Sequence, residues 1–507
     1  MAIPINLHSI QGNSLGGFSK DFQSNLFLKF TGDKTGRAWL KEIIEQISSS
    51  ADVIQFNNEF RALKKQGVKK PESIISAVWV NVAISFAGLQ ALKVNAPDLA
   101  KFPGAYQNGM AKATTGDTGA SDPSQWIPPF KQPADVHAVL IVAADQPSEL
   151  AKKVADMTGT AAFKAGAQVL LNQVGLTRSD LPGHEHFGFK DGVSQPGIRG
   201  IDSPDDPIGN PDQGHPGQDL LWPGEFILGY ETQIPTSKAG HDGPNPDPGP
   251  PSQSGPSWTK DGSYLVFRRL RQDVSAFKKN VHDLAHQLGW SEDLTGAKLV
   301  GRYKSGCPIE QRKFQPGPYA PPSIDPGNPN TGNPALATSN TLNNNFEFGD
   351  DPQGVNCPMS AHIRKAYPRD EETPAGPANS ESSTQTHRLL RRGIPYGEPF
   401  KPHVPGSEKI DRGLLFLAYQ NDIKNHFEFV QNAWVNNAGF PPNPAGQPPL
   451  KGAPGQDPII AQSPAGDMLI DPAKNPVSIQ HFVTTTGGEY FLSPSIDTLQ
   501  ALGDGAL

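Results

Sequence analysis

The sequence predicts an α+β protein made of two similar halves, and three observations support this fold class. Short segments rich in alternating apolar and β-branched residues, typical of strands, interleave with amphipathic helical segments in both halves. The connections between them vary too much in length for a regular doubly wound sheet. The order of strands and helices is similar in the two halves, although no sequence repeat is convincing.

The predicted strands are apolar runs bounded by turn residues. They lie at residues 25–30, 80–87 and 136–144 in the first half, and at residues 264–270, 413–420 and 483–492 in the second. Helices are predicted at residues 36–48, 148–157 and 273–288, where apolar residues recur at helical spacing.

Glycine and proline mark the predicted loops. The chain of 507 residues contains 52 Gly and 51 Pro, about a fifth of the total compared with roughly 12% on average. They are concentrated at residues 236–258 and 314–354, which we interpret as long loops on a folded body. The first loop predicts two domains, at residues 1–240 and 258–507. The second is a candidate lid, because long loops in compact proteins are often functional.

Charge and apolar content exclude some classes of protein. The net charge of −7 argues against nucleic-acid binding, which needs clustered positive charge. No run of 18 apolar residues predicts a membrane-spanning helix. The absence of a signal-like N-terminus and of any Asn-x-Ser/Thr sequon favours a cytoplasmic location, although a processed extracellular chain would look the same. Cys307 and Cys357 are expected to be buried free thiols, with a single disulfide as the alternative.

Three segments place a polar group in apolar, glycine-rich surroundings. Asp191 follows Phe187-Gly188-Phe189-Lys190, so desolvation is expected to raise the pKa of its carboxyl group and allow proton exchange with a substrate; a turn aspartate is the alternative. His362 lies among small and apolar residues, which suits an imidazole facing a buried cavity; a core histidine is the alternative. Arg391 follows two leucines and is expected to be buried, which would require an anionic partner.

Together these segments resemble the dye-decolorising peroxidase family, and its fungal branch most. Gly188-x-x-Asp191-Gly192 resembles the family's hallmark loop, residues 361–364 its haem-ligand segment and residues 391–397 its distal-arginine segment. Further similar segments run from residues 10–12 to residues 487–491. The resemblance implies two ferredoxin-like modules of the dimeric α+β barrel type, with antiparallel sheets and long loops rich in proline and glycine.

The resemblance also implies a cofactor and its site. One haem b would be bound mainly by the C-terminal module, with His362 as the iron ligand and Asp457 as the acceptor for the other ring nitrogen. Asp191 and Arg391 would act on hydrogen peroxide as the distal catalytic pair. Leu414 and Phe416 would wall the distal pocket.

The implied activity is that of a haem peroxidase. Hydrogen peroxide would be used to oxidise dyes, phenols and other aromatic compounds by one-electron steps through an oxyferryl intermediate, best at acidic pH. Because bulky dyes cannot reach a buried haem, Tyr396 and Trp434 are implied as surface sites of electron transfer, with ordinary core or rim aromatics as the alternative. Self-association as a homodimer is expected. The alternative function is a haem-binding or iron-handling protein with incidental peroxidase activity.

Overall fold

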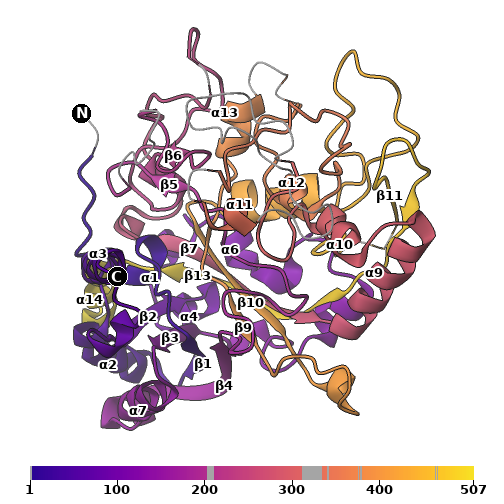
Figure 1. The fold of residues 1–507 in the computed structure, drawn as a ribbon. Coiled ribbons are helices and arrows are strands. Elements are labelled where there is room, and N and C mark those ends of the chain that lie inside the picture. Colours follow the sequence, from indigo (N-terminus) through magenta and orange to yellow (C-terminus); the bar gives the residue numbers. More distant parts are fainter. Residues whose placement is uncertain are drawn as a thin grey trace.

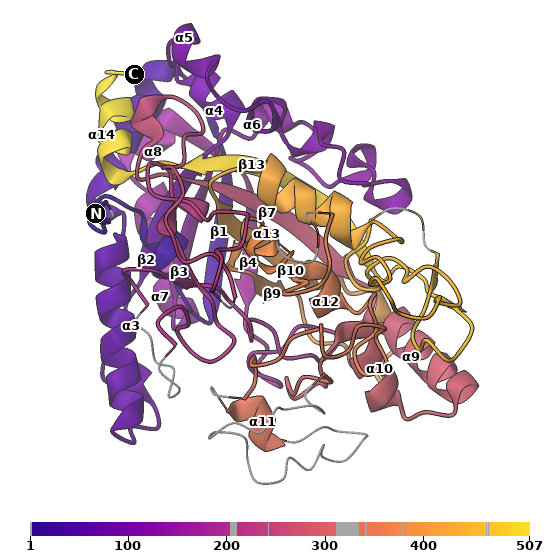
Figure 2. The same cartoon turned by 90° about the horizontal axis from the view of Figure 1, so that it is seen from above.

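The computed structural model describes residues 3–202, 210–241, 243–310, 334–339, 342–374, 376, 380–462, 464 and 466–507. In this part of the chain the main sheet has nine strands in the order β4-β1-β3-β2-β13-β7-β10-β8, with β9 also paired to β10. All neighbouring strands in it are antiparallel. Figures 1 and 2 show the N-terminal and C-terminal halves side by side across this sheet.

Each half of the chain supplies about half of the main sheet. The first half supplies β1 (Phe22–Phe30), β2 (Trp79–Ile84), β3 (Ala138–Ala144) and β4 (Ala167–Leu176). The second supplies β7 (Ser263–Gln272), β8 (Leu390–Arg391), β9 (Ile394–Tyr396), β10 (Gly413–Gln420) and β13 (Val483–Ser493). Small separate pairs are β5 (Gly197–Ile198) with β6 (Leu220–Leu221), and β11 (Asp467–Met468) with β12 (Val477–Ser478). The predicted α+β fold with two ferredoxin-like modules is therefore confirmed.

The helices pack around this sheet and at its ends. The first half carries α1 (Gly12–Leu15), α2 (Asp33–Ile43), α3 (Ser50–Lys65), α4 (Phe86–Ala91), α5 (Ala96–Leu99), α6 (Gly104–Asn108), α7 (Pro147–Thr158) and α8 (Ala161–Gly166). The second carries α9 (Val274–Leu288), α10 (Glu292–Val300), α11 (Pro334–Thr338), α12 (His362–Ala366), α13 (Ser380–Gln385), the π-helical turns η12 (Lys424–Glu428) and η13 (Val430–Val435), and α14 (Ile496–Asp504). The three predicted helices correspond to α2, α7 and α9.

Two long elements were not predicted, and one predicted strand is too long. The pattern for α3 was present in the sequence, because Val53, Phe56, Phe60 and Leu63 recur at helical spacing, although only Ser50 and Val53 are buried. In β4 exposed and half-buried residues do not alternate regularly. The strand predicted at residues 80–87 ends at Ile84, because the Ser85 side chain accepts a hydrogen bond from the Gly88 N–H and caps α4.

The sheet curls until its two ends approach each other. Phe27 on β1 and Phe267 on β7 are separated by three strands in the sheet order, yet their rings lie 4.8 Å apart in the shared core. Arg269 on β7 donates a hydrogen bond to Gln173 on β4. Gly175 on β4 lies against β9, where a Cβ atom would come within 2.4 Å of Ile394. The sheet thus forms a barrel around one core.

The end of the chain joins the two halves. Strand β13 lies between β2 and β7. The following helix, α14, returns to the N-terminal half, where Arg37 of α2 donates a hydrogen bond to the Leu502 carbonyl oxygen (Figure 1). The halves therefore share one sheet, and the domain boundary expected between residues 240 and 258 stays a prediction.

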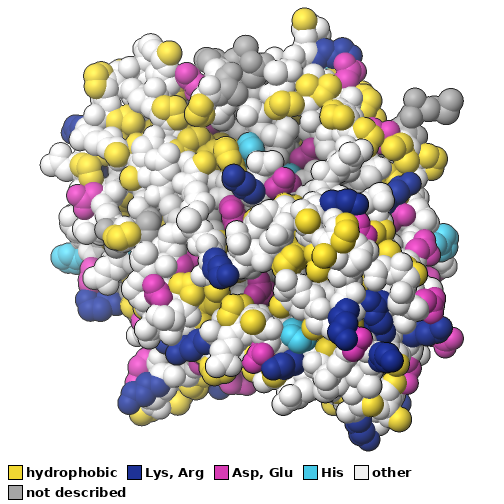
Figure 3. Space-filling model, turned by 180° about the vertical axis from the view of Figure 1, so that it is seen from behind, with side chains coloured by type: hydrophobic (Ala, Val, Ile, Leu, Met, Phe, Trp, Pro, Cys, Tyr) yellow, Lys and Arg dark blue, Asp and Glu magenta, His cyan; other side chains and the backbone are white. Residues whose placement is uncertain are grey.

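Other expectations concern the loops and the surface. Cys307 and Cys357 are both buried and are not joined by a disulfide, as expected. Much of the second predicted loop, residues 314–333 and 340–341, lies outside the described residues. None of the helices described is both long and apolar enough to cross a bilayer. On the face in Figure 3, acidic and basic side chains are interspersed.

Candidate active site

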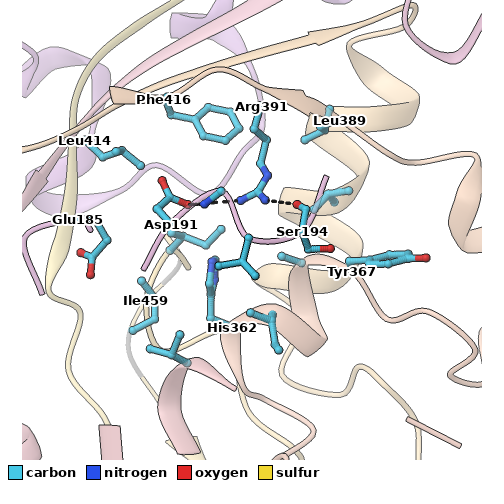
Figure 4. Close-up of a pocket in the computed structure, with 18 of the residues that line it drawn as sticks. Glu185, Asp191, Ser194, His362, Tyr367, Leu389, Arg391, Leu414, Phe416 and Ile459 are labelled. Carbon is cyan, nitrogen blue, oxygen red and sulfur yellow. Dashed lines mark hydrogen bonds and ion pairs between the residues drawn. The ribbon is translucent and has the colours of Figure 1, made fainter. Parts of the chain in front are cut away.

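A cavity of about 330 Å³ lies where the two halves meet. Its walls come from residues 185–196 of the first half and, in the second, from β7, β10, α12, residues 387–393 and residues 459–460. Most of the lining side chains are apolar. Figure 4 shows His362 on one side of the cavity and Asp191 and Arg391 on the other. The structure therefore brings together the three predicted polar groups.

His362 is fixed by a carboxylate behind it. Its Nδ1 atom lies 2.8 Å from Asp457 Oδ2, and Asp457 is 1% exposed. The other Asp457 oxygen accepts the N–H groups of Ile459 and Ile460, which fixes the carboxylate in turn. Burial lowers the pKa of His362, but the charge of Asp457 and the hydrogen bond to it outweigh burial, so the pKa lies above its ordinary value. A carboxylate can only accept, so Nδ1 carries the proton and Nε2 is left for the cavity.

The short helix α12 is held by two buried cations that follow His362. Arg364 is fully buried and donates hydrogen bonds to Glu371 and to the carbonyl oxygens of Cys357 and Asp351. Lys365 is also fully buried, and burial lowers its pKa to about 7. A helix of five residues has little stability of its own, so these contacts determine where His362 points.

Asp191 projects into the cavity from a hairpin loop. Its Oδ1 atom accepts the Gly192 N–H at 2.7 Å and lies 3.8 Å from an Arg391 guanidinium nitrogen. The side chain is 38% exposed. The prediction that apolar neighbours bury this carboxylate is therefore wrong, because Phe187 and Phe189 turn away from it and pack on Phe277 of α9.

Arg391, the last residue of β8, faces Asp191 across the upper side of the cavity (Figure 4). Its Nη2 donates to the Ser194 carbonyl oxygen at 2.6 Å. Gln195 bonds to both the N–H and the carbonyl oxygen of Arg391, which ties β8 to the loop after Asp191. The expected anionic partner is present, but the expected burial is not, since the side chain is 35% exposed.

Leu414 and Phe416 line the cavity on the same side as Arg391 (Figure 4). They lie two residues apart on β10, so both side chains point to the same face of the sheet. An apolar wall beside a carboxylate and a guanidinium limits the water that can solvate them, which strengthens their electrostatic interactions with a bound molecule.

Comparison with known families agrees with this geometry. A model described as "DyP dimeric alpha+beta barrel domain" matches residues 9–179, and a second, "Dyp-type peroxidase, C-terminal", matches residues 251–440. The chain belongs to the dye-decolorising peroxidase family.

Full-length relatives of this dye-decolorising peroxidase are similar over almost the whole chain. Dye-decolorizing peroxidase msp1 of Mycetinis scorodonius is 32% identical over 98% of this chain and 88% of its own length. The crystal structure of a fungal DyP-type peroxidase from Auricularia auricula-judae has 30% identity and a TM-score of 0.75, covering 99% of this chain and 100% of that one. A DyP complex with 2,6-dimethoxyphenol has 30% identity and a TM-score of 0.74, covering 98% and 100%.

These relatives identify the chain as a haem peroxidase, an enzyme that reduces hydrogen peroxide and oxidises dyes and aromatic compounds. They favour the enzyme over the haem-handling alternative. The cavity volume lies in the usual range for ligand sites, roughly 300–1,000 Å³.

One end of the cavity suits the carboxylates of a haem. Arg302 and Arg369 line this end and are each 4% exposed. Among the residues that the structure describes, both bond only to neutral oxygens: those of Gly306, Asn343 and Asn344 for Arg302, and those of Asn344 and Phe346 for Arg369. Buried guanidinium groups without an anion are costly. The two propionates of a haem would supply the missing charge, so the residues present fit this group.

The two aromatic residues expected at the surface, Tyr396 and Trp434, are buried. Tyr396 is 2% exposed, and its ring lies 4.2 Å from the Arg269 guanidinium. Trp434 is 3% exposed and stacks on Phe440. The prediction of surface sites is therefore wrong, because each ring is covered by its neighbours, and neither lines the cavity.

Other residues that line the cavity were not predicted from the sequence. Arg302, Arg369 and Arg388 are among them, but other charged residues lie within three positions of each in the sequence, so nothing local sets these arginines apart from surface arginines. Glu185 lines it as well, six residues before Asp191. These residues could have been suspected because they lie in or beside the segments that resemble the peroxidase family.

Proposed function

We propose that this enzyme holds haem b between His362 and the Asp191–Arg391 pair, and that the pair cleaves hydrogen peroxide. The supporting observation is the arrangement across one apolar cavity: a carboxylate-bound imidazole on one wall, and a carboxylate and guanidinium 3.8 Å apart on the opposite wall (Figure 4). Separately, each could be a structural residue.

His362 would hold the iron through Nε2, while Asp457 accepts the Nδ1 proton. This hydrogen bond orients the ring and makes it a more basic ligand. Arg302 and Arg369 would pair with the propionates. When bound, the haem supplies the iron that binds peroxide and the electrons that reduce it.

Asp191 would move the proton of the peroxide. Its carboxylate would accept a proton from one peroxide oxygen and deliver it to the other, which would leave as water when the O–O bond breaks. The Arg391 guanidinium, held in place by the Ser194 carbonyl, stabilises the negative charge that develops on the departing oxygen. Leu414 and Phe416 exclude competing water from this step.

The reducing substrates would be phenols and other aromatic compounds, oxidised one electron at a time, two for each peroxide. The relative with bound 2,6-dimethoxyphenol supports small phenols. Dyes too large for a cavity of about 330 Å³ would have to be oxidised at the protein surface, by residues still to be assigned.

Haemin titration of the purified chain, followed by rapid mixing with peroxide, tests this proposal. We expect a Soret band that His362→Ala abolishes and that Asp191→Asn retains, while Asp191→Asn slows the reaction with peroxide about 10²- to 10⁴-fold. His282→Ala, at an exposed histidine paired with Glu292, serves as the control for the ligand. A full haem spectrum in His362→Ala, or undiminished peroxide reactivity in Asp191→Asn, would refute the corresponding role.

A further inference from the structure

Glu185 lies at the start of the hairpin that ends at Asp191, and it lines the same cavity (Figure 4). The proposed mechanism gives it no role. Its carboxylate accepts two hydrogen bonds from within the hairpin: Oε2 from the Phe187 N–H and Oε1 from the Phe189 N–H, both at 2.8 Å. The side chain is thus folded into the turn that precedes Asp191.

A third donor connects this carboxylate to the main sheet. Gln272, the last residue of β7, donates through Nε2 to Glu185 Oε2 at 2.5 Å. Strand β7 is paired on both sides, with β10 and β13, and is therefore a rigid support. No lysine, arginine or histidine in the described part of the chain forms an ion pair with Glu185. Its partners are N–H donors, as expected of an anchor rather than a salt bridge.

The hairpin transmits this anchoring to Asp191. The Asp191 N–H donates to the Gly183 carbonyl oxygen at 2.9 Å, and His184 and Lys190 form a β-bridge. Gly188, with a φ of +99°, provides the turn between the two phenylalanines. A movement of the Phe187–Phe189 turn would therefore shift the backbone that carries the Asp191 carboxylate relative to Arg391.

We infer that Glu185 is a positioning residue for the peroxide step: its carboxylate clamps the Phe187–Phe189 turn to β7 and so sets the place of Asp191 opposite Arg391. The inference rests on the proposed role of Asp191. Only a carboxylate serves here, because the Phe187 and Phe189 N–H groups bond to different oxygens of the side chain. A glutamine would offer one oxygen and direct its NH₂ group at the other donor.

The test compares Glu185→Gln with a matched control. Glu489 is a buried carboxylate outside the cavity that accepts two backbone N–H groups, from Met110 and Tyr490, on a single oxygen. Glu489→Gln therefore removes a buried carboxylate elsewhere while an amide oxygen can keep both hydrogen bonds. Hydrogen exchange of the Phe187 and Phe189 amides is measured with and without haem. Rapid mixing then measures the reaction with peroxide and the later reaction with a phenol separately.

In Glu185→Gln we expect about 10-fold faster exchange of these amides and a peroxide step slowed on the order of 10- to 100-fold. Haem content and the phenol step should stay unchanged, and Glu489→Gln should change neither the hairpin exchange nor the peroxide step. Gln272→Leu, which removes only the connection to β7, should act in the same direction more weakly, and it carries the test if Glu185→Gln does not fold.

Unchanged exchange of the Phe187 and Phe189 amides in both Glu185→Gln and Gln272→Leu would overturn the inference. Equal slowing of the peroxide step and the phenol step would overturn it as well. Faster exchange with an unchanged peroxide step, while Asp191→Asn remains slow, would overturn the role of Glu185 and leave that of Asp191 intact. An Asp191→Asn variant as fast as the parent would instead overturn the proposed function on which the inference rests.

Discussion

Glu225 shows how burial without a nearby cation changes a carboxyl group. It is 3% exposed, and its Oε1 accepts the Gln233 N–H at 2.7 Å. Burial raises the pKa of Glu225 to about 8 and lowers that of His426, 3.6 Å away, to about 4. At neutral pH both side chains are therefore uncharged, and they form a neutral contact instead of an ion pair.

This carboxyl group should make stability depend on pH. Between pH 4.5 and 8 the folded chain keeps a Glu225 proton that the unfolded chain has released, so the free energy of unfolding falls as pH rises. Glu225→Gln has no such proton and keeps an acceptor oxygen. We expect the free energy of unfolding of this variant, relative to the parent, to rise from pH 5 to pH 8 by on the order of 4 kcal/mol. The difference in melting temperature between the two proteins should grow over the same range. Thermal melts check this, with the exposed Glu72→Gln as the control; a pH-independent difference would contradict it.

The residues of the candidate site could be predicted from the sequence where a polar residue lies in a recognisable local pattern. Asp191, His362 and Arg391 each lie among small and apolar neighbours, and these three residues meet at one cavity. Their exposure could not be predicted, because a residue's sequence neighbours can turn away from it, as Phe187 does. The covering of Trp434 by Phe440 likewise arises only when η13 folds back on the chain that follows it.

At the scale of elements, α12 is held in place by contacts with other parts of the chain. The Lys365 ammonium donates to the carbonyl oxygens of Trp434, Asn437 and Phe440, at and beyond the end of η13. Of these three residues only Trp434 lies in η13, where a carbonyl group at the helix end needs a donor from outside the helix. One lysine therefore connects the end of η13 and the chain after it to the helix that carries His362.

Lys365→Met should therefore affect stability and haem retention together. Leaving buried carbonyl groups without donors is expected to lower the free energy of unfolding by about 2–4 kcal/mol. Because α12 would shift, we also expect faster haem loss, measured by transfer to an excess of a haem-acceptor protein. Lys409→Met, at an exposed position, should have neither effect. Normal haem retention in Lys365→Met would show that α12 is positioned by Arg364 alone.

Six strands of the main sheet could be predicted because buried strands are nearly continuous apolar runs. Three strands of this sheet were missed. Strands β8 and β9 have only two and three residues, and β4 leaves one side partly open to solvent, so its pattern is irregular. The order of the strands in the sheet could not be predicted, because an apolar run indicates that a strand is buried but does not identify the strands with which it pairs. The position of β13 between β2 and β7 depends on tertiary packing alone.

At the scale of the whole molecule, closure of the barrel depends on close contact between β4 and β9. Gly175 leaves no room for a side chain, since a Cβ atom there would lie 2.4 Å from the Ile394 Cγ2 atom and 3.2 Å from the Pro395 oxygen. Ile394 follows Arg391 by three residues, so the closure of the barrel and the place of the distal guanidinium are coupled.

Gly175→Ala should overpack this contact. We expect the free energy of unfolding to fall by about 1–3 kcal/mol, measured by urea denaturation. In the double variant with Ile394→Ala the two effects should be less than additive, because the truncated side chain makes room for the new methyl group. Gly104→Ala, where a Cβ atom meets nothing within 4 Å, is the control. Strict additivity would show that the two strands do not restrain each other.

The expected homodimer stays a prediction, which sedimentation would test.

The position of β13 has a consequence for the order of events during synthesis. During translation, β1 to β4 can pair as soon as they leave the ribosome, because all four lie within the first 176 residues. Strand β7 must wait for one of its two partners until residues 483–493, the last strand of the main sheet in chain order, have emerged. The cavity, one wall of which is β7, therefore gains its full support only after β13 has been synthesised, so the chain cannot hold the cofactor firmly before that strand has folded.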